Sequence, residues 1–149
     1  MSTSAHWLEA RTAIEGAFST AWAAATVVLF ENTKTEPPKS TAYVTLTILT
    51  GGEAEYASLG NPPRRRYRGV VIVRCFVPGG TGSAAVEGLV GNAEEVFFNP
   101  ATGVGREISS GAHGQIVLDE PPSREPAGPT NGFYAVIVSA PFYRDQQGA

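Results

Sequence analysis

Two stretches of the chain repeat apolar residues at the spacing of an amphipathic helix. In the N-terminal stretch the steps are seven, four, four and three residues, and the repeating positions are Trp7, Ile14, Phe18, Trp22 and Ala25. This spacing places them on one face of a helix with 3.6 residues per turn. A second stretch, from near Ser83 to about Phe98, repeats Val86, Leu89, Val90, Ala93 and Phe97. The pattern therefore predicts two helices, the first ending near Ala24.

Other stretches alternate apolar and polar residues, or run continuously apolar, as strands do. Strands are predicted at residues 26–31, 41–49, 67–77 and 133–142, with a short one at 54–59. Residues 105–110 and 114–119 are predicted to form a hairpin. The run Val70 to Val73 is apolar on both sides, which favours a central strand with both faces covered.

Glycine and proline mark the predicted interruptions. Pro37 and Pro38 lie in a predicted loop at 32–39, because proline cannot donate to a strand ladder. Gly51-Gly52 is expected to end the strand before it, and residues 60–63 and 121–129 are expected to be loops. The order of elements predicts an α+β fold, with two helices packed on one face of a mainly antiparallel sheet. The second face of that sheet is expected to meet something else, such as another subunit.

Composition limits the classes of protein. A chain of 149 residues with a net charge of −3 fits one folded domain, and 17 glycines and 11 prolines indicate long loops. The sequence shows no signal peptide and no apolar run long enough for a membrane span, so we expect synthesis inside the cell and no membrane partner. An acidic isoelectric point near 5.4 argues against a general nucleic-acid binder.

Three motifs deserve a chemical interpretation. Residues 80–85 match the glycine-rich fingerprint of dinucleotide-binding proteins, but no second βαβ unit follows, so a plain strand-to-helix turn is the favoured interpretation. His113 precedes Asp119 and Glu120, yet no serine or cysteine lies in a nucleophile context, which favours a solvated turn histidine. Cys75 is expected to be a small packed strand residue, since a lone cysteine forms no internal disulfide.

The densest cluster of charge surrounds one tyrosine. It consists of Arg64, Arg65, Arg66, Tyr67 and Arg68. A solvated segment leading into a strand is one interpretation, and a phosphate contact or an ion pair across a protein interface is another. Protein is favoured over nucleic acid because the rest of the chain has no basic stripe. The residues reveal no reaction centre, no metal cage and no cofactor site.

The order of short motifs along residues 5–143 resembles the tail-terminator-like minor tail proteins of long-tailed bacteriophages. The resemblance rests on Ala21-Trp22, Phe30-Glu31-Asn32, Pro37-Pro38 before Tyr43-Val44, Ser58-Leu59-Gly60, Tyr67-Arg68-Gly69, Phe76-Val77-Pro78-Gly79-Gly80-Thr81-Gly82, Phe97-Phe98, Gly132-Phe133-Tyr134 and Pro141-Phe142-Tyr143. It implies one domain over residues 1–149, no catalytic residues and no cofactor.

The resemblance also implies a structural role in the virion. Such proteins form homo-oligomeric rings, commonly of six copies, on the head-proximal end of the tail tube, where they stop tube growth and meet the head connector. The partners implied are therefore the tail tube protein and the connector, with DNA passing through the lumen without specific binding. We hypothesise that residues 51–68, including the arginine cluster, and residues 121–132 carry the ring or tube contacts. The alternatives are another neck connector protein and a small nucleotide-binding domain that uses residues 80–85.

Overall fold

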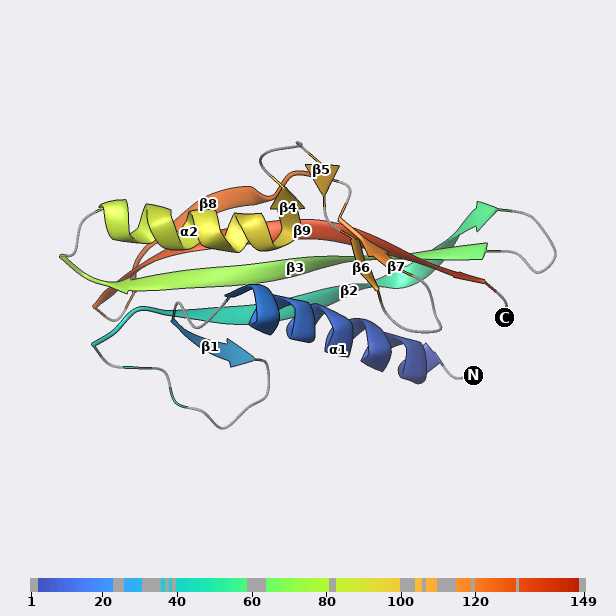
Figure 1. Cartoon of the computed structure of the whole chain (residues 1–149), viewed down its shortest axis with the longest axis horizontal. Coiled ribbons are helices and arrows are strands. Elements are labelled where there is room, and N and C mark those ends of the chain that lie inside the picture. The colour runs from blue at the N-terminus through green and yellow to red at the C-terminus, as the bar shows by residue number, and fades with distance from the viewer. Residues whose placement is uncertain are drawn as a thin grey trace.

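Three long strands dominate the computed structural model of the protein (Figure 1). They are β2 (Tyr43–Ser58), β3 (Arg64–Pro78) and β9 (Phe133–Gln147). The structure describes residues 3–22, 26–30, 36, 38, 40–58, 64–80, 83–99, 104–105, 107–109, 115–118, 120–130 and 132–147.

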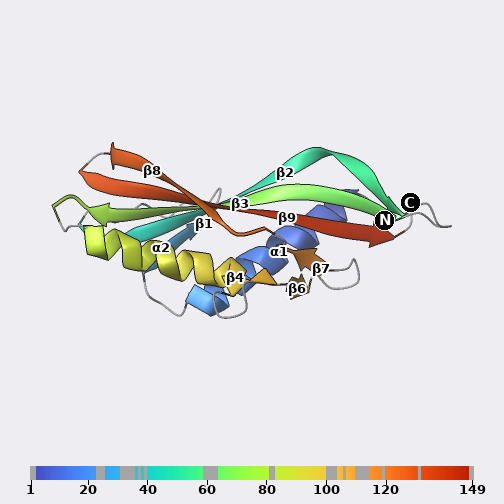
Figure 2. The same cartoon turned by 90° about the horizontal axis from the view of Figure 1, so that it is seen from above.

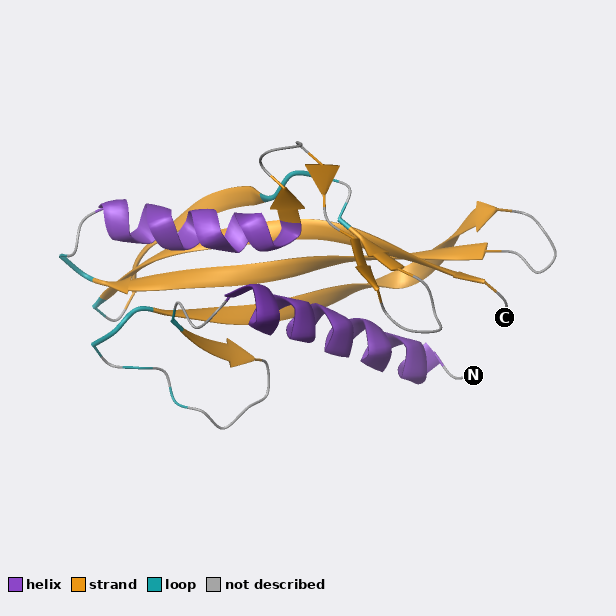
Figure 3. Ribbon diagram, viewed as in Figure 1, coloured by secondary structure: helices purple, strands orange, loops and turns teal. Residues whose placement is uncertain are grey.

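The remaining elements are two helices and several shorter strands (Figure 3). The helices are α1 (Thr3–Trp22) and α2 (Ser83–Phe97). The shorter strands are β1 (Val27–Phe30), β4 (Phe98–Asn99), β5 (Val104–Gly105), β6 (Glu107–Ser109), β7 (Gln115–Val117) and β8 (Ser123–Thr130).

Seven of these strands form one sheet. Its order is β1-β2-β3-β9-β7-β6, and β8 pairs with the first half of β9. Every pairing in it is antiparallel except that of β1 with β2, which is parallel. Strands β4 and β5 form a separate two-stranded ladder. The predicted α+β class with a mainly antiparallel sheet is therefore confirmed, as is the predicted hairpin, which is β6–β7.

Both helices pack on the same face of the sheet, as predicted (Figure 2). The sheet contributes alternate residues to the core beneath them, because successive side chains of a strand point to opposite faces. These are Val44, Leu46 and Ile48 on β2, Val71, Val73, Cys75 and Val77 on β3, and Val136, Val138, Ala140 and Phe142 on β9. We call the opposite side of the sheet the far face.

The predicted helical stripes are the faces that the helices bury. In α1 the stripe runs through Ala10, Ile14, Phe18 and Trp22, and the rings of Phe18 and Trp22 stack with centroids 5.1 Å apart. The side chain of Trp7 and residue Ala25 lie outside the described part. In α2 the five predicted positions are all buried. The ring of Phe18 also stacks on Phe97 of α2 at 6.0 Å, so aromatic contacts join the two helices over the sheet.

Two interruptions predicted from glycine and proline, a strand end at Gly51-Gly52 and a loop over most of residues 121–129, were wrong. Strand β2 does not stop at Gly51-Gly52: it continues to Ser58, with a register shift between Thr50 and Ala54 that a β-bulge absorbs. Residues 123–130 are not a loop but the edge strand β8. Proline is tolerated there because an edge strand makes only one ladder, and a second register shift lies between Pro126 and Gly128.

At the margin of the sheet formed by β1 and β2, a side chain of α1 binds the strand backbone. Strand β1 pairs with β2 only as far as Leu46. Two residues further along β2, the guanidinium Nη2 of Arg11 on α1 donates a hydrogen bond of 3.3 Å to the carbonyl oxygen of Ile48. Helix α1 thus binds the β2 backbone just beyond the end of the parallel pairing.

Candidate subunit interface

The arginine cluster lies at one end of the sheet, where its three long strands end. Strands β2, β3 and β9 run side by side there, and their tips extend beyond the N-terminal end of α1 (Figure 1). We call this extension the arm: residues 54–58 of β2, 64–68 of β3 and 143–147 of β9. The predicted interface residues therefore belong to a strand rather than to a loop. The side chains of Arg64 and Arg65 lie outside the described part.

Alternation divides the rest of the cluster between the two faces of the arm. Tyr67 shares the helix-facing side with the core residues Val71 and Val73, whereas Arg66 and Arg68 point to the far face. Arg68 is exposed, and Arg66 and Tyr67 are partly buried. The five predicted residues are thus contiguous in sequence but do not form one patch.

Arg66 is held by two groups of β9. Its Nε and Nη2 atoms donate hydrogen bonds of 2.8 and 3.1 Å to the two carboxylate oxygens of Asp145, its register partner. The guanidinium carbon also lies 4.0 Å from the centroid of the Tyr143 ring. A bidentate, partly buried pair neutralises the guanidinium and fixes its orientation. The Arg66 side chain therefore links β3 to β9 within the arm. Because its guanidinium is already neutralised by Asp145, it is a poor candidate for a phosphate contact.

Sequence reasoning missed a buried arginine at the base of the arm. Arg144 has no solvent exposure and lies on the helix-facing side of β9, where it pairs in register with Tyr67 on one side and Ile116 of β7 on the other. The alternation of strand 133–142 continues through Phe142 to Arg144 and was the available signal. A buried guanidinium at this point makes the root of the arm part of the folded core.

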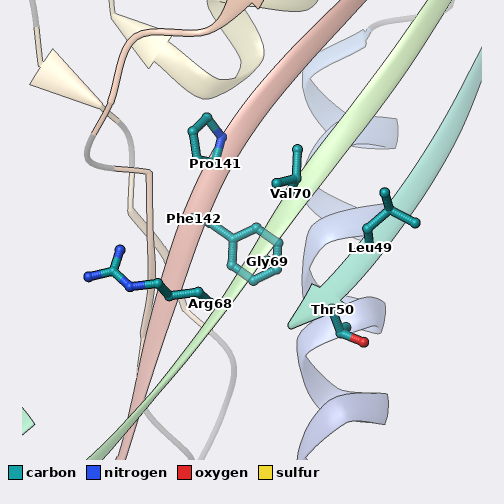
Figure 4. A pocket seen from close by; sticks show the side chains of 7 residues that line it. All are labelled: Leu49, Thr50, Arg68, Gly69, Val70, Pro141 and Phe142. Carbon is teal, nitrogen blue, oxygen red and sulfur yellow. The ribbon is translucent and has the colours of Figure 1, made fainter. Parts of the chain in front are cut away.

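At the root of the arm each long strand has an irregular residue. Strand β2 has its bulge after Thr50, β3 has Gly69 opposite Thr50, and β9 has Pro141 opposite Val70. At this level the far face has a hollow of about 350 Å³ (Figure 4). We call it the arm-root hollow; its lining is Leu49, Thr50, Arg68, Gly69, Val70, Pro141 and Phe142.

Most of the residues that line the arm-root hollow are apolar, and Thr50 and Arg68 are its polar members. Leu49 is 52% exposed, whereas the ring of Phe142 beside Gly69 is buried and belongs to the core. Arg68 extends from the rim (Figure 4). The apolar surface that the hollow exposes is therefore mainly Leu49, with the partly buried Val70 and Pro141 beside it.

The prediction that both faces of the central strand are covered is confirmed only in part along the rest of the far face. The ring of Tyr43 stacks on Phe76 at 4.6 Å and meets Phe133 edge-on at 5.4 Å, so these aromatic residues shield one another at the end opposite the arm. Burial raises the pKa of the Tyr43 hydroxyl. Between this cluster and the arm, Val70 and Ile72 are only partly buried. Strand β3 is central, as predicted, but its far side is half-exposed in the single chain.

Strand β8 is fixed to helix α2 by ion pairs. Arg124 donates a hydrogen bond of 2.7 Å to Glu87, and its Nε donates one of 3.3 Å to Glu94, whose second oxygen accepts from Arg124 Nη2. These bonds raise the pKa of Arg124. The contact holds a strand that lies at the surface along most of its length.

The remaining candidate residues behave as structural elements where they are described. Gly80 has a φ of +84°, and the Gly79 amide donates to the Gly132 carbonyl at 2.8 Å, so the start of residues 80–85 is a turn that joins two strand ends. Thr81 and Gly82 of that motif, and His113, lie outside the described residues. Cys75 is fully buried, and burial, with a smaller effect of Glu94, raises its thiol pKa to about 12.

The residues that the structure describes contain no cluster of three or more histidine, cysteine or carboxylate side chains that could hold a metal ion. Within the same ranges, neither helix is both long enough and apolar enough to span a membrane.

An arm, a half-exposed sheet face and an exposed edge strand are surfaces of the kind that an assembly protein uses. Comparison with known proteins identifies the family: the model of the phage tail terminator protein family matches residues 9–142, and the chain belongs to this family. The family is structural, and its members are components of phage tails.

Solved structures support the fold assignment. Seven chains of known structure match this one. One of them, whose title states no function, is 26% identical and superposes with a TM-score of 0.68, covering 95% of this chain and 96% of its own. No curated protein matches the chain.

Proposed function

We propose that this protein is the tail terminator of its phage. Copies of it associate into a ring, commonly of six, that binds the head-proximal end of the finished tail tube. The ring stops further addition of tube subunits and offers the head connector a surface to join. The observation that carries the proposal is the family match over residues 9–142, which spans both helices and nearly all of the sheet.

Physical reasoning supports this mechanism without any chemical step. A tube grows because each layer presents to the next a surface that differs from the one it uses to bind. A cap binds the last such surface but does not reproduce it, so growth ends. Six weak contacts made together supply the avidity that a single subunit contact lacks. DNA passes through the lumen of such a ring without sequence-specific contacts.

The surfaces for these contacts are the arm and the far face. Within the arm, the exposed Arg68 lies on the far face. The half-exposed residues Val70 and Ile72 extend the same surface toward the body of the sheet. Association would bury these apolar groups, and the gain from that burial is the driving force for subunit contacts.

The alternative function is that of another neck connector protein. It would use subunit contacts of the same kind at a different position in the virion. The alternative of a nucleotide-binding domain gains no support, because Gly80 belongs to a turn and the sheet, as far as the structure describes it, contains no pair of βαβ units.

The test is a phage genome with this gene deleted. We expect tails of irregular, extended length that do not join to capsids, and recovery of normal virions when the gene is supplied on a plasmid. Purified protein added to finished tubes should appear as a cap at one end in electron micrographs. Deletion virions with normal tails joined to capsids would overturn the proposal. Normal tails that fail only to join would favour the connector role.

A further inference from the structure

One register row on the far face of the sheet places a cation, an apolar group and a carboxylate side by side. Arg74 of β3 pairs in register with Ile137 of β9, and Ile137 pairs with Glu125 of β8. Directly opposed residues of an antiparallel pair point to the same face of the sheet. For this row it is the far face, because Ile137 alternates with the core residues Val136 and Val138.

The two charged side chains of this row are available to a partner. Arg74 and Glu125 are both exposed. Within the part of the chain that the structure describes, neither side chain has an ion pair or a side-chain hydrogen bond. Strand β9 lies between them and keeps their backbones roughly 10 Å apart, which is two strand spacings. Each charge can therefore pair with an opposite charge on another molecule.

The surface around this row is otherwise uncharged. Figure 2 shows both helices on one side of the sheet and no described element over the other side. We call this part of the far face the far-face strip. Its members are Phe76, Arg74 and Ile72 on β3, Ala135, Ile137, Ser139 and Pro141 on β9, and Ser123, Glu125 and Gly128 on β8. The strip thus has an uncharged middle strand, with one positive charge on one side and one negative charge on the other.

This arrangement makes the far-face strip complementary to a copy of itself. A two-fold axis that runs along β9, between two sheets packed face to face, exchanges the positive side with the negative side. Arg74 of each copy then faces Glu125 of the other copy, and Ile137 faces its own counterpart. A two-fold axis across the strands would instead place Arg74 over Arg74 of the other copy. The charges therefore favour the axis along β9.

We propose that two copies of the protein form a symmetric dimer through the far-face strip. Two Arg74–Glu125 ion pairs flank the contact between the Ile137 side chains, and burial of Ile72 and Ile137, which are partly exposed in one chain, stabilises it. A surface three strands wide is smaller than the interfaces of stable complexes, so the dimer should separate on dilution. An isologous contact closes at two copies, so this dimer is distinct from a ring, which requires heterologous contacts.

Dimerisation also withholds a surface from assembly. The dimer covers part of the far face, which the proposed function assigns to contacts within the tail. A dimer must therefore open before its two copies enter a ring. Only this consequence rests on the proposed function, because the dimer itself follows from the charges of the strip.

Charge reversal tests the contact, with sedimentation as the measurement. The wild type should dimerise at high protein concentration, and Arg74→Glu or Glu125→Arg alone should raise the dissociation constant by about tenfold or more. An equimolar mixture of the two variants should dimerise like the wild type, because both ion pairs of a mixed dimer join opposite charges. Glu120→Arg, the same charge change at an exposed residue before β8, is the matched control and should leave the dissociation constant unchanged. In dilute solution every variant should melt like the wild type.

Thiol cross-linking tests the position of the axis. In Ser139→Cys the two introduced thiols of a dimer lie close to the two-fold axis, so a short bismaleimide should join them. Native Cys75 is buried and gives little background. Ala85→Cys, on the exposed surface of α2 and therefore on the other side of the sheet, should give no cross-linked dimer.

The outcomes separate this inference from the proposed function. A wild type that stays monomeric at high concentration, or a mixture of the two charge variants that fails to dimerise, would overturn the dimer and leave the terminator role untouched. If the protein stays monomeric while purified tail tubes protect Ser139→Cys from labelling, the far-face strip binds the tube and the dimer is wrong. Deletion virions with normal, joined tails would remove the terminator role and leave the dimer standing.

Discussion

The ring of Phe142 occupies the space beside Gly69 where any other residue would place its Cβ. A Cβ built there would lie 2.5 Å from the Phe142 ring and 2.7 Å from the carbonyl oxygen of Leu49. The second of these neighbours is backbone and cannot rotate away. Glycine at position 69 therefore lets β2, β3 and β9 approach one another at the root of the arm.

We predict that Gly69→Ala destabilises the protein by about 1–3 kcal/mol, the usual cost of overpacking. Denaturant titration followed by fluorescence of Trp22 and Trp7 would measure the loss. Because the clash lies at the root of the arm, amides of the arm should also exchange hydrogen faster than those near Cys75. A variant as stable as the wild type would contradict the close contact.

Glycine in the interior of α2 should respond in the opposite way. A Cβ at Gly88 would meet no atom within 4 Å, and its φ is not in the left-handed region. Gly88→Ala is therefore expected to raise the free energy of unfolding by about 0.5–1 kcal/mol. Gly80→Ala, where φ is +84° with equally open space, serves as the control and should lower it.

The pair of Arg66 and Asp145 should show measurable coupling. Arg66→Gln and Asp145→Asn each break a bidentate, partly buried pair, and each should cost about 1–3 kcal/mol. A double-mutant cycle with both changes isolates their interaction energy, for which we expect a value above 0.5 kcal/mol. Arg74→Gln on the same strand should be nearly neutral. Additive single changes would show that the pair contributes nothing to the arm.

Cys75 should be unreactive in the folded protein and should make stability depend on pH at the alkaline end. Burial raises its pKa from 9.0 to about 12. Between these values the folded state keeps the thiol proton that the unfolded state loses, so the free energy of unfolding should fall as pH rises from 9 to 12. Cys75→Ala should flatten that decline. At pH 8 a thiol reagent should label the wild type only in denaturant.

Removing the Arg124 contact should loosen β8 more than it unfolds the protein. The three side chains are 25–60% exposed, so Arg124→Ala should cost less than about 1 kcal/mol of global stability. Hydrogen exchange of the β8 amides should increase, while that of β3 should not.

Periodicity in the sequence was sufficient to predict the layers. The stripes through Phe18 and Phe97 identified the buried faces of both helices, and the alternation around Val138 identified a core strand. These patterns survive because each element buries one face against the same core. The parallel pairing of β1 with β2 was not predictable, since it depends on a contact between strands rather than on either strand alone.

The errors arose where local residue preferences and the fold disagree. Gly51-Gly52 indicates a break, but the pairing of β2 with β3 continues past it through a bulge. Prolines 126 and 129 indicate a loop, but an edge strand has only one ladder to satisfy. For the candidate interface, the sequence located the arginine cluster, whereas the neutralisation of Arg66 by Asp145 depends on residues 79 positions apart.

The Arg11 side chain on the Ile48 carbonyl and the prolines of β8 lie at opposite margins of the sheet. Bare sheet margins at high protein concentration lead to fibrils. Shielding at both margins makes runaway stacking of whole subunits unfavourable. Such shielding would keep concentrated protein from forming fibrils before it is built into a tail.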